Sequence, residues 1–455
     1  MEEKELFAIK KELENLIKKN PDNKDARFSL AALYYNLGNS FLRQKKFDDA
    51  IKNYLSSIKS DKTFVHSYYN LGNAYKERND LEKAIEYFQK TTEIDQKNIP
   101  AKINLAVAHS ASGNSKECIK NFEDLLSIND YKSNLNNKME ADIRYSLGIE
   151  LLREGNYEEG LKNYEHRLEA SDYPLIINEN KKKVKNLDEI KNKKLLVISE
   201  QGFGDTLQFV RYTKLLKEYT SEIYFQCNKK MFRILKSVGH IKKFYDFEDK
   251  IENYDFYVPL MSLPYLFKTN LKNIPNFNYI EPEANLVNEW KVKLKDKKGF
   301  KIGLFWQGNV DSSGSRARAI KLKDLEILLE FKNVDFVSLQ KGDGHEQIKE
   351  SKFSKYMVDS NDNIDIGEDA FIDTAAIIKN LDLIISSDTS IIHLSGAIGK
   401  RVWMLEPKVP NWPWTNYGNT SPWYKNLQIF RQEEKDNWNK PIKELKNKLS
   451  EVLHK

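Results

Sequence analysis

Two aspartates each stand between a short apolar run and a helical pattern, where a carboxylate can either cap a helix or face a ligand. Asp205 lies in SEQGFGDT, directly after the run LLVI at 195–198, and Asp388 lies in SSDTSIIH, after DLII at 382–385. If the runs are strands of parallel sheets, both turns lie at the carboxyl edge, where ligands bind. A carboxylate there can take a proton from a hydroxyl as general base or accept hydrogen bonds from a sugar.

The turn before Asp205 contains two glycines and leaves two hypotheses open. Aspartate is a favoured helix N-cap, and the residues alone favour a capping role. The alternative is a base facing an acceptor, with Gln201 and Arg211 as candidate supports. Because Arg211 lies six residues along the helix, contact with a neighbouring element or the solvent is favoured for it. A dinucleotide fingerprint would need glycine at position 207, where the chain has leucine, so binding of NAD is disfavoured. The residues predicted to form the acceptor-side loop are Gln201, Gly202 and Gly204.

A second group of residues is suited to binding a diphosphate. In KIGLFWQGNVDSSGSRARAIKL (301–322), Gln307 and Asn309 follow a predicted strand, and Arg316 and Arg318 lie in the loop after it. Arginines in such a loop make charge-assisted contacts with phosphate oxygens. The alternative is a surface loop with solvated arginines.

The block from Asp388 to His393 is the more specific signal. Asp388, Thr389 and Ser390 open a predicted helix, whose exposed N–H groups favour an anion. Asp388 is expected to bind a ribose or sugar hydroxyl, with plain helix capping as the alternative. His393 lies one turn along, where a packed histidine is the commoner outcome.

A Pro-rich loop downstream concentrates aromatic residues. They either stack on a base or sugar or anchor the loop hydrophobically. The residues are Trp412, Trp414, Trp423 and Tyr424.

The elements that precede these motifs form an internal repeat. YYNLGNSFLRQKKFDDAIKNY (34–54) recurs as YYNLGNAYKERNDLEKAIEYF (68–88), a shift of 34 residues, and two further copies follow. Small residues recur at 50, 84 and 118 and aromatic residues at 54, 88, 122 and 164. The pattern matches the tetratricopeptide repeat, with residues 3–19 as a capping helix. Its concave surface either recruits a partner protein or packs on the next domain as a brace.

Beyond the repeats, strand-like runs alternate with helical patterns, which predicts parallel sheets covered by helices. The predicted fold class is α + α/β: an all-α tetratricopeptide solenoid, then two Rossmann-like α/β domains. The predicted boundaries are 1–169 for the repeats, 170–193 for a linker, 194–298 for an acceptor-side lobe and 299–455 for a donor-side lobe. The basic run KKKVK (181–185) is interpreted as part of the solvated linker.

Composition narrows the functional classes. The 73 Lys and Arg nearly balance 67 Asp and Glu, so the net charge of +6 gives no reason to expect a nucleic-acid partner. Two distant cysteines, no signal peptide and no long apolar stretch favour a cytoplasmic protein without a transmembrane segment.

Taken together, these motifs resemble bacterial proteins that join tetratricopeptide repeats to a glycosyltransferase family 9-like, heptosyltransferase-type module. The blocks that carry the resemblance are YEHR (164–167), EQGFGDTLQFVRY (200–212), GLFWQGN (303–309), SLQKG (338–342) and DTAAIIKNLDLIISSDTSIIHLSGAIGKRVW (373–403).

The resemblance implies a two-lobed GT-B transferase, inverting and metal-independent, with a nucleotide-sugar donor and no resident cofactor. Asp205 matches the proposed base of heptosyltransferases. Asp388, Thr389 and His393 match their DTG-x-x-H donor block, with Ser390 where they have glycine, and Arg318 corresponds loosely to their basic phosphate-binding residue. The acceptor is a glycan, a lipid or a protein hydroxyl. A non-catalytic scaffold or a nucleotide-sugar-binding pseudo-transferase is the alternative.

Overall fold

The computed structural model describes residues 3–127, 137–170, 181–309, 311, 313–359 and 364–454. The chain divides into two compact units. The first contains Met1–Leu151 and Glu169–Ser171, and the second contains Leu152–Leu168 and Asp172–Lys455. Each unit is described by itself.

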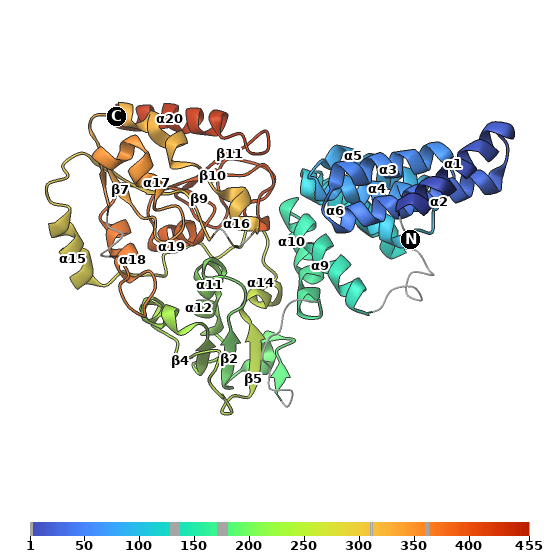
Figure 1. Ribbon diagram of the computed structural model, residues 1–455. Coiled ribbons are helices and arrows are strands. Elements are labelled where there is room, and N and C mark those ends of the chain that lie inside the picture. The colour runs from blue at the N-terminus through green and yellow to red at the C-terminus, as the bar shows by residue number, and fades with distance from the viewer. Residues whose placement is uncertain are drawn as a thin grey trace. The chain divides into compact units, whose positions relative to one another are not determined.

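The first unit consists of antiparallel helix pairs in the register that the 34-residue repeat predicts (Figure 1). Close packing within a pair depends on glycine facing an aromatic ring. A Cβ added at Gly38 would lie 2.5 Å from the Tyr54 ring, and one at Gly72 would lie 2.7 Å from Phe88. A larger residue at either position would displace the ring or the partner helix, so a small residue recurs here, with Ala106 at the equivalent position of the third repeat.

The predicted capping helix is present as α1, ahead of the repeats. The helices up to the end of the fourth repeat are α1 (Glu3–Lys19), α2 (Lys24–Arg43), α3 (Phe47–Ser60), α4 (Val65–Glu77), α5 (Leu81–Ile94), α6 (Ile99–Ser112), α7 (Ser115–Ser127), α9 (Asn137–Arg153) and α10 (Tyr157–Tyr164).

The first α/β lobe is built on a five-stranded parallel sheet with the order β1-β5-β2-β3-β4. Its central strand β2, whose four residues are all buried, is the run LLVI that precedes the Asp205 turn. The strands are β1 (Lys182–Lys183), β2 (Leu195–Ile198), β3 (Ile223–Gln226), β4 (Lys243–Tyr245) and β5 (Phe256–Pro259).

The second α/β lobe has a six-stranded parallel sheet with the order β11-β10-β9-β6-β7-β8. Strand β9, which leads to Asp388, lies between β10 and β6 and is buried throughout. The strands are β6 (Phe300–Phe305), β7 (Val334–Ser338), β8 (Met357–Val358), β9 (Leu383–Ser387), β10 (Val402–Glu406) and β11 (Leu427–Arg431).

Helices follow most strands of both sheets, as in Rossmann-like domains (Figure 1). The principal ones are α11 (Phe203–Phe209), α12 (Thr213–Leu216), α13 (Phe232–Leu235), α14 (Leu263–Leu266), α15 (Ala284–Lys293), α16 (Ser313–Arg318), α17 (Gln347–Glu350), α18 (Ile372–Lys379), α19 (Ser390–Ile398) and α20 (Asn439–Leu453). The stretch Leu322–Glu330 is a 3-10 helix, η7. The α + α/β fold class, helical repeats followed by two parallel-sheet α/β domains, is confirmed.

The segment predicted as a linker contains regular structure. Lys182 and Lys183 form the edge strand β1, parallel to β5, and Val184 is buried. Leu187 and Ile190 lie in a short 3-10 helix and are buried too. The apolar residues interspersed among the lysines therefore attach this part of the basic run to the first lobe, contrary to its interpretation as solvated.

Helix α10 belongs to the same compact unit as the two lobes, although the predicted repeat domain runs to residue 169. Its Tyr157 and Tyr164 rings contact Trp412, with centroids 6.2 and 5.7 Å apart. The last repeat helix thus supplies core residues to the α/β unit.

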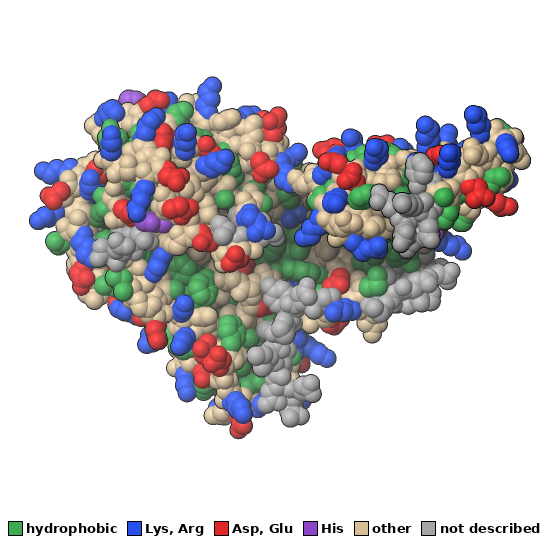
Figure 2. All heavy atoms as spheres, viewed as in Figure 1, with side chains coloured by type: hydrophobic (Ala, Val, Ile, Leu, Met, Phe, Trp, Pro, Cys, Tyr) green, Lys and Arg blue, Asp and Glu red, His purple; other side chains and the backbone are tan. Residues whose placement is uncertain are grey.

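Basic and acidic side chains are mixed over the face of the molecule seen in Figure 2, in keeping with the small net charge. Within the described ranges, no helix combines the length and apolar character that crossing a bilayer requires.

Candidate functional site

Asp205 lies in the first turn of α11, immediately beyond the carboxyl end of β2. Its Oδ2 accepts a hydrogen bond from the backbone N–H of Gly202 at 3.0 Å. The residue at the helix N-cap is Gly202. Asp205 therefore stabilises the helix start from inside the first turn and is not itself the N-cap that the residues favoured.

The environment of Asp205 favours its protonated form more than water does. Burial raises the pKa of the carboxyl from 3.8 to about 6, and the Asp388 charge raises it further. The Gly202 N–H and the Arg318 charge act in the opposite direction. A carboxylate with a pKa near 6 is matched to proton abstraction near neutral pH.

The two lobes meet where α11 approaches α19 (Figure 1). Gly204 permits this approach, because a Cβ there would lie 3.1 Å from the His393 ring and 3.5 Å from Ser390 Cα. The contact brings the predicted acceptor-side loop and the predicted donor block together. The sequence placed these residues in separate lobes and did not predict how close they are.

Asp388 is an ion-pair partner within the second α/β lobe. Its buried Oδ2 accepts hydrogen bonds from Arg318 Nη1 at 3.1 Å and from Asn411 Nδ2 at 2.5 Å. Arg318 lies at the end of the short helix α16, so it is not a solvated loop residue, whereas Arg316 is exposed. Asp388 therefore holds the arginine in place and does not cap α19.

Helix α19 begins at Ser390, with Thr389 as its N-cap. The Thr389 side chain makes no capping hydrogen bond to the helix, and its hydroxyl lies 3.2 Å from Ser386 Oγ. The N–H groups of a first helical turn lack intrahelical partners and carry the positive end of the helix dipole. This end of α19 is thus suited to hold an anionic group beside Arg318.

His393 is a packed residue, as the sequence favoured. Its ring stacks on Trp414 with centroids 5.2 Å apart, and its Nδ1 is 3.1 Å from the Tyr424 hydroxyl. Burial lowers the pKa of His393 to about 4, so the imidazole is neutral near pH 7. Its place against Gly204 nevertheless keeps it at the junction between the lobes.

The aromatic loop anchors the lobes and is too buried to stack on a base. All four predicted aromatic residues are at most 7% exposed: Trp412, Trp414, Trp423 and Tyr424. Trp412 and Trp423 pack on Phe209 of α11. Of the two interpretations left open by the sequence, hydrophobic anchoring is the one seen.

Arg211 serves the same junction and does not contact Asp205. Its buried guanidinium donates to the carbonyls of Gln208, Pro275 and Trp423 and to the Tyr279 hydroxyl. The cation also lies over the ring of Tyr424, 4.5 Å from its centroid. Arg211 thus faces a neighbouring element, as its position favoured, and joins α11 to the second α/β lobe.

Gln307 and Asn309 have local roles. The Gln307 backbone N–H donates to Gln340, and its side-chain Oε1 accepts from Gln347. Asn309 is exposed and accepts a hydrogen bond from the Asp311 N–H at 2.8 Å. These contacts order the loop after β6, and donor binding by the pair stays a prediction.

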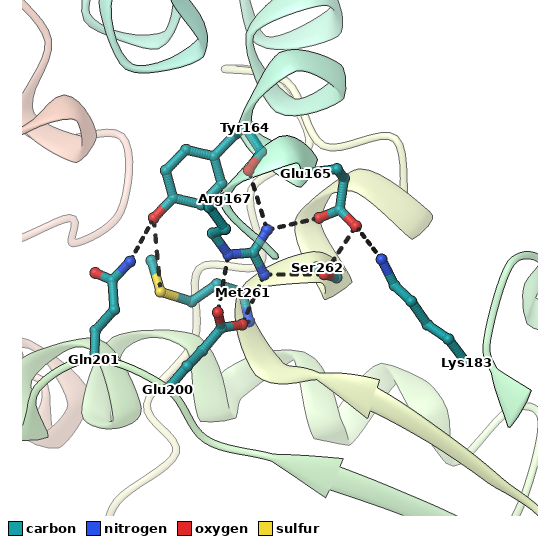
Figure 3. A network of polar contacts seen from close by, with 8 residues as sticks. All are labelled: Tyr164, Glu165, Arg167, Lys183, Glu200, Gln201, Met261 and Ser262. Atoms are coloured by element: carbon teal, nitrogen blue, oxygen red, sulfur yellow. Dashed lines mark hydrogen bonds and ion pairs between the residues drawn. The ribbon is translucent and has the colours of Figure 1, made fainter. Parts of the chain in front are cut away.

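The structure adds a buried network that the sequence did not predict, centred on Arg167 after α10 (Figure 3). Its Nε and Nη2 donate to the two Glu200 oxygens at 2.9 and 2.7 Å, and Nη2 also donates to Ser262. Its Nη1 donates to Glu165 and to the Tyr164 carbonyl. All five N–H donors of the guanidinium are therefore used. In the sequence, the only sign of this network is the charged residues of YEHR (164–167) and the glutamate before QGFGD, Glu200.

The same network reaches the turn that carries Asp205. Glu200 also accepts from the Met261 N–H at 3.0 Å, and Gln201 Nε2 donates to the Tyr164 hydroxyl at 2.9 Å (Figure 3). Lys183 of β1 completes the cluster through Glu165. Polar contacts thus connect the last repeat helix and the residues just after it to Glu200 and Gln201 in the β2–α11 turn.

Comparison with known proteins accounts for the helical array. A family model described as "Tetratricopeptide repeat" matches residues 29–97. The N-terminal helices are tetratricopeptide repeats. Among curated proteins, "Protein FlbA" of Caulobacter vibrioides is 24% identical over 273 residues, which is 55% of this chain and 45% of that protein. This chain thus spans less than half of the length of that relative.

Solved structures resemble the two parts separately. The glycosyl transferase family 9 protein from Veillonella parvula covers 58% of this chain, and 98% of that chain is matched, at 10% identity and a TM-score of 0.44. E. coli ADP-heptose lps heptosyltransferase II covers 57% of this chain and is matched over 98% of its own, at 12% identity and a TM-score of 0.41. The order of the strands in the two parallel sheets and the helices between them define the fold of this part of the chain.

Proposed function

We propose that this protein is a glycosyltransferase that moves a sugar from a nucleotide-sugar donor to a hydroxyl of a glycan, lipid or protein. The observation that supports it best is the position of Asp205. This carboxyl, with its raised pKa, lies on α11 against the N-terminal turn of α19, next to the Arg318–Asp388 pair. Asp205 of the first lobe, as proton acceptor, and the first turn of α19 in the second lobe, as a site for an anion, thus lie at the junction between the two lobes.

The proposed reaction is a single displacement with inversion at the anomeric carbon. Asp205 accepts the proton of the acceptor hydroxyl as its oxygen bonds to that carbon. The bond from the anomeric carbon to the diphosphate breaks, and the nucleoside diphosphate leaves with the bonding electrons. Arg318 and the first-turn N–H groups of α19 stabilise the charge on the leaving group. We propose that no metal takes part, as the family resemblance implies.

The proposed role of Asp205 predicts an acid limb in the pH profile. Only the ionised carboxylate acts as base, so kcat/KM should rise with pH, about tenfold per unit below pH 6, and level off above it. Initial rates with saturating acceptor and limiting donor, measured from pH 4.5 to 8, test this. A profile that stays flat across pH 6 would assign proton removal to another group.

Donor binding can be tested apart from turnover. Purified full-length protein is titrated calorimetrically with a panel of nucleotide sugars, alongside Arg318→Ala and the exposed neighbour Arg316→Ala. Because a hydrogen bond to a charged group contributes about 1.5–3 kcal/mol, Arg318→Ala should weaken binding of the best donor by roughly 10–100-fold. Arg316→Ala should leave the affinity within a factor of about two, since its side chain is exposed.

The outcomes separate the proposal from its alternatives. A panel in which no nucleotide sugar binds would favour a repeat scaffold that lacks donor chemistry. Binding without hydrolysis or transfer would indicate a nucleotide-sugar-binding pseudo-transferase. Labelled sugar that appears on protein, and not on lipid or free glycan, would identify the acceptor class.

The tetratricopeptide repeats suggest protein interaction. We propose that their concave surface recruits the acceptor or a partner protein. The cytoplasm is the proposed location.

A further inference from the structure

We infer that Tyr164, at the end of the last repeat helix, is a positioning residue for the turn that carries Asp205. The inference rests on the proposed function of Asp205. Helix α10 is described with the two lobes in one compact unit, so the contact is internal to that unit. The Tyr164 hydroxyl accepts a hydrogen bond from Gln201 Nε2 at 2.9 Å and lies 3.8 Å from Met261 Sδ.

The conformation of Gln201 explains why this contact matters. Its φ of 61° places a residue with a side chain in the left-handed region, which is disfavoured without glycine. Such a conformation persists when the surroundings hold it in place. Glu200, immediately before it, is held by Arg167 and the Met261 N–H, and Gln201 itself is held by Tyr164 (Figure 3).

The consequence for Asp205 follows from the short distance along the chain. Gly202, one residue beyond Gln201, donates its N–H to the Asp205 carboxylate. A change of backbone angle at Gln201 therefore moves the donor that orients the proposed base. Misplacement of a reacting group by about 1 Å can cost roughly 10²-fold in rate.

The repeat register shows that the Tyr164 hydroxyl is not needed for packing. The equivalent positions in the first three repeats are Tyr54, Phe88 and Phe122, each at most 1% exposed. Phenylalanine thus fills this position in two other repeats. A tyrosine at 164 adds only a hydroxyl, and that hydroxyl contacts the turn.

Tyr164→Phe therefore isolates the contact in a variant expected to fold. The matched control is Tyr54→Phe, which removes a comparable bond to Asn39 Oδ1 from the first unit. Backbone amide hydrogen exchange of residues 200–206 should be roughly 2–10-fold faster in Tyr164→Phe than in the wild type, because the variant loses the stabilisation of one neutral hydrogen bond. Exchange in Tyr54→Phe should match the wild type in this segment.

Kinetics should show the same contact. With the best donor and acceptor, Tyr164→Phe should lower kcat by roughly tenfold and leave the donor KM unchanged. The double variant Tyr164→Phe/Gln201→Leu should be no slower than the slower single variant, because both remove the same hydrogen bond. Additive losses, or unchanged exchange at 200–206, would overturn the inference. If Tyr164→Phe speeds hydrogen exchange at residues 200–206 but the wild-type protein shows no transferase activity, the contact role of Tyr164 stands and only the proposed function is wrong.

Discussion

Asp205→Asn should lower kcat by roughly 10²–10⁴-fold, the contribution expected of a general base. Asparagine has nearly the same shape, and its amide oxygen can still accept the Gly202 N–H, so the start of α11 should be preserved. What the variant loses is the ability to accept a proton. Steady-state transfer assays and calorimetric donor titration should together show a large fall in kcat with donor affinity nearly unchanged.

A capping aspartate elsewhere provides the control for this variant. Asp80 is the N-cap of α5 and accepts the Lys83 N–H, so Asp80→Asn changes a cap without touching either lobe. It should leave transfer and the melting temperature close to the wild-type values. If Asp205→Asn also retains normal transfer, Asp205 is only a helix-stabilising residue and the proposed mechanism is wrong.

Arg167→Met should be the most destabilising single change proposed, at about 3–5 kcal/mol, because it leaves a buried carboxylate without its partner. The side chains of Arg167 and Glu200 are 0% and 1% exposed. Burial lowers the pKa of Arg167, but Glu200 and Glu165 outweigh this and hold it above its ordinary value. Denaturant unfolding monitored by tryptophan fluorescence reports on this unit, since every tryptophan lies in it.

Two comparisons identify the origin of the loss. Arg233→Met breaks an exposed pair with Glu283, whose side chains are 41% and 38% exposed, and should cost at most about 1 kcal/mol. The double variant Arg167→Met/Glu200→Leu should recover much of the loss, because it no longer leaves a charge buried alone. If the loss of unfolding free energy in the double variant equals the sum of the losses in Arg167→Met and Glu200→Leu, the network stabilises the protein by packing and not by charge pairing.

Much of the fold was predictable from sequence because it depends on local pattern. The 34-residue period gave the helix pairs, and Gly38 against Tyr54 shows why that period requires small and aromatic residues together. Strands β2 and β9 are apolar on both faces, which is typical of buried parallel strands. The short edge strands β1, β4 and β8 were not predicted, because two or three residues carry no recognisable period.

The predicted site residues divide according to whether their roles depend on local or distant contacts. Asp205 and Thr389 were located correctly at strand-to-helix turns, since such turns follow from the order of elements. The partners of Asp388 were not predictable, because Arg318 and Asn411 are 70 and 23 residues away. The stacking role considered for the aromatic loop was wrong, because burial against α11 depends on tertiary packing alone.

The tetratricopeptide repeats, the two parallel-sheet lobes and the aspartate at the edge of each sheet were all predictable from the order of residues along the chain. These features follow from periodicity and from the residues on either side of each turn. The three-dimensional contacts were needed to show that the last repeat helix belongs to the α/β unit, and that Arg167 and Tyr164 contact Glu200 and Gln201 before Asp205. Such contacts join segments more than 30 residues apart, and their strength comes from burial, which no local pattern of residues encodes.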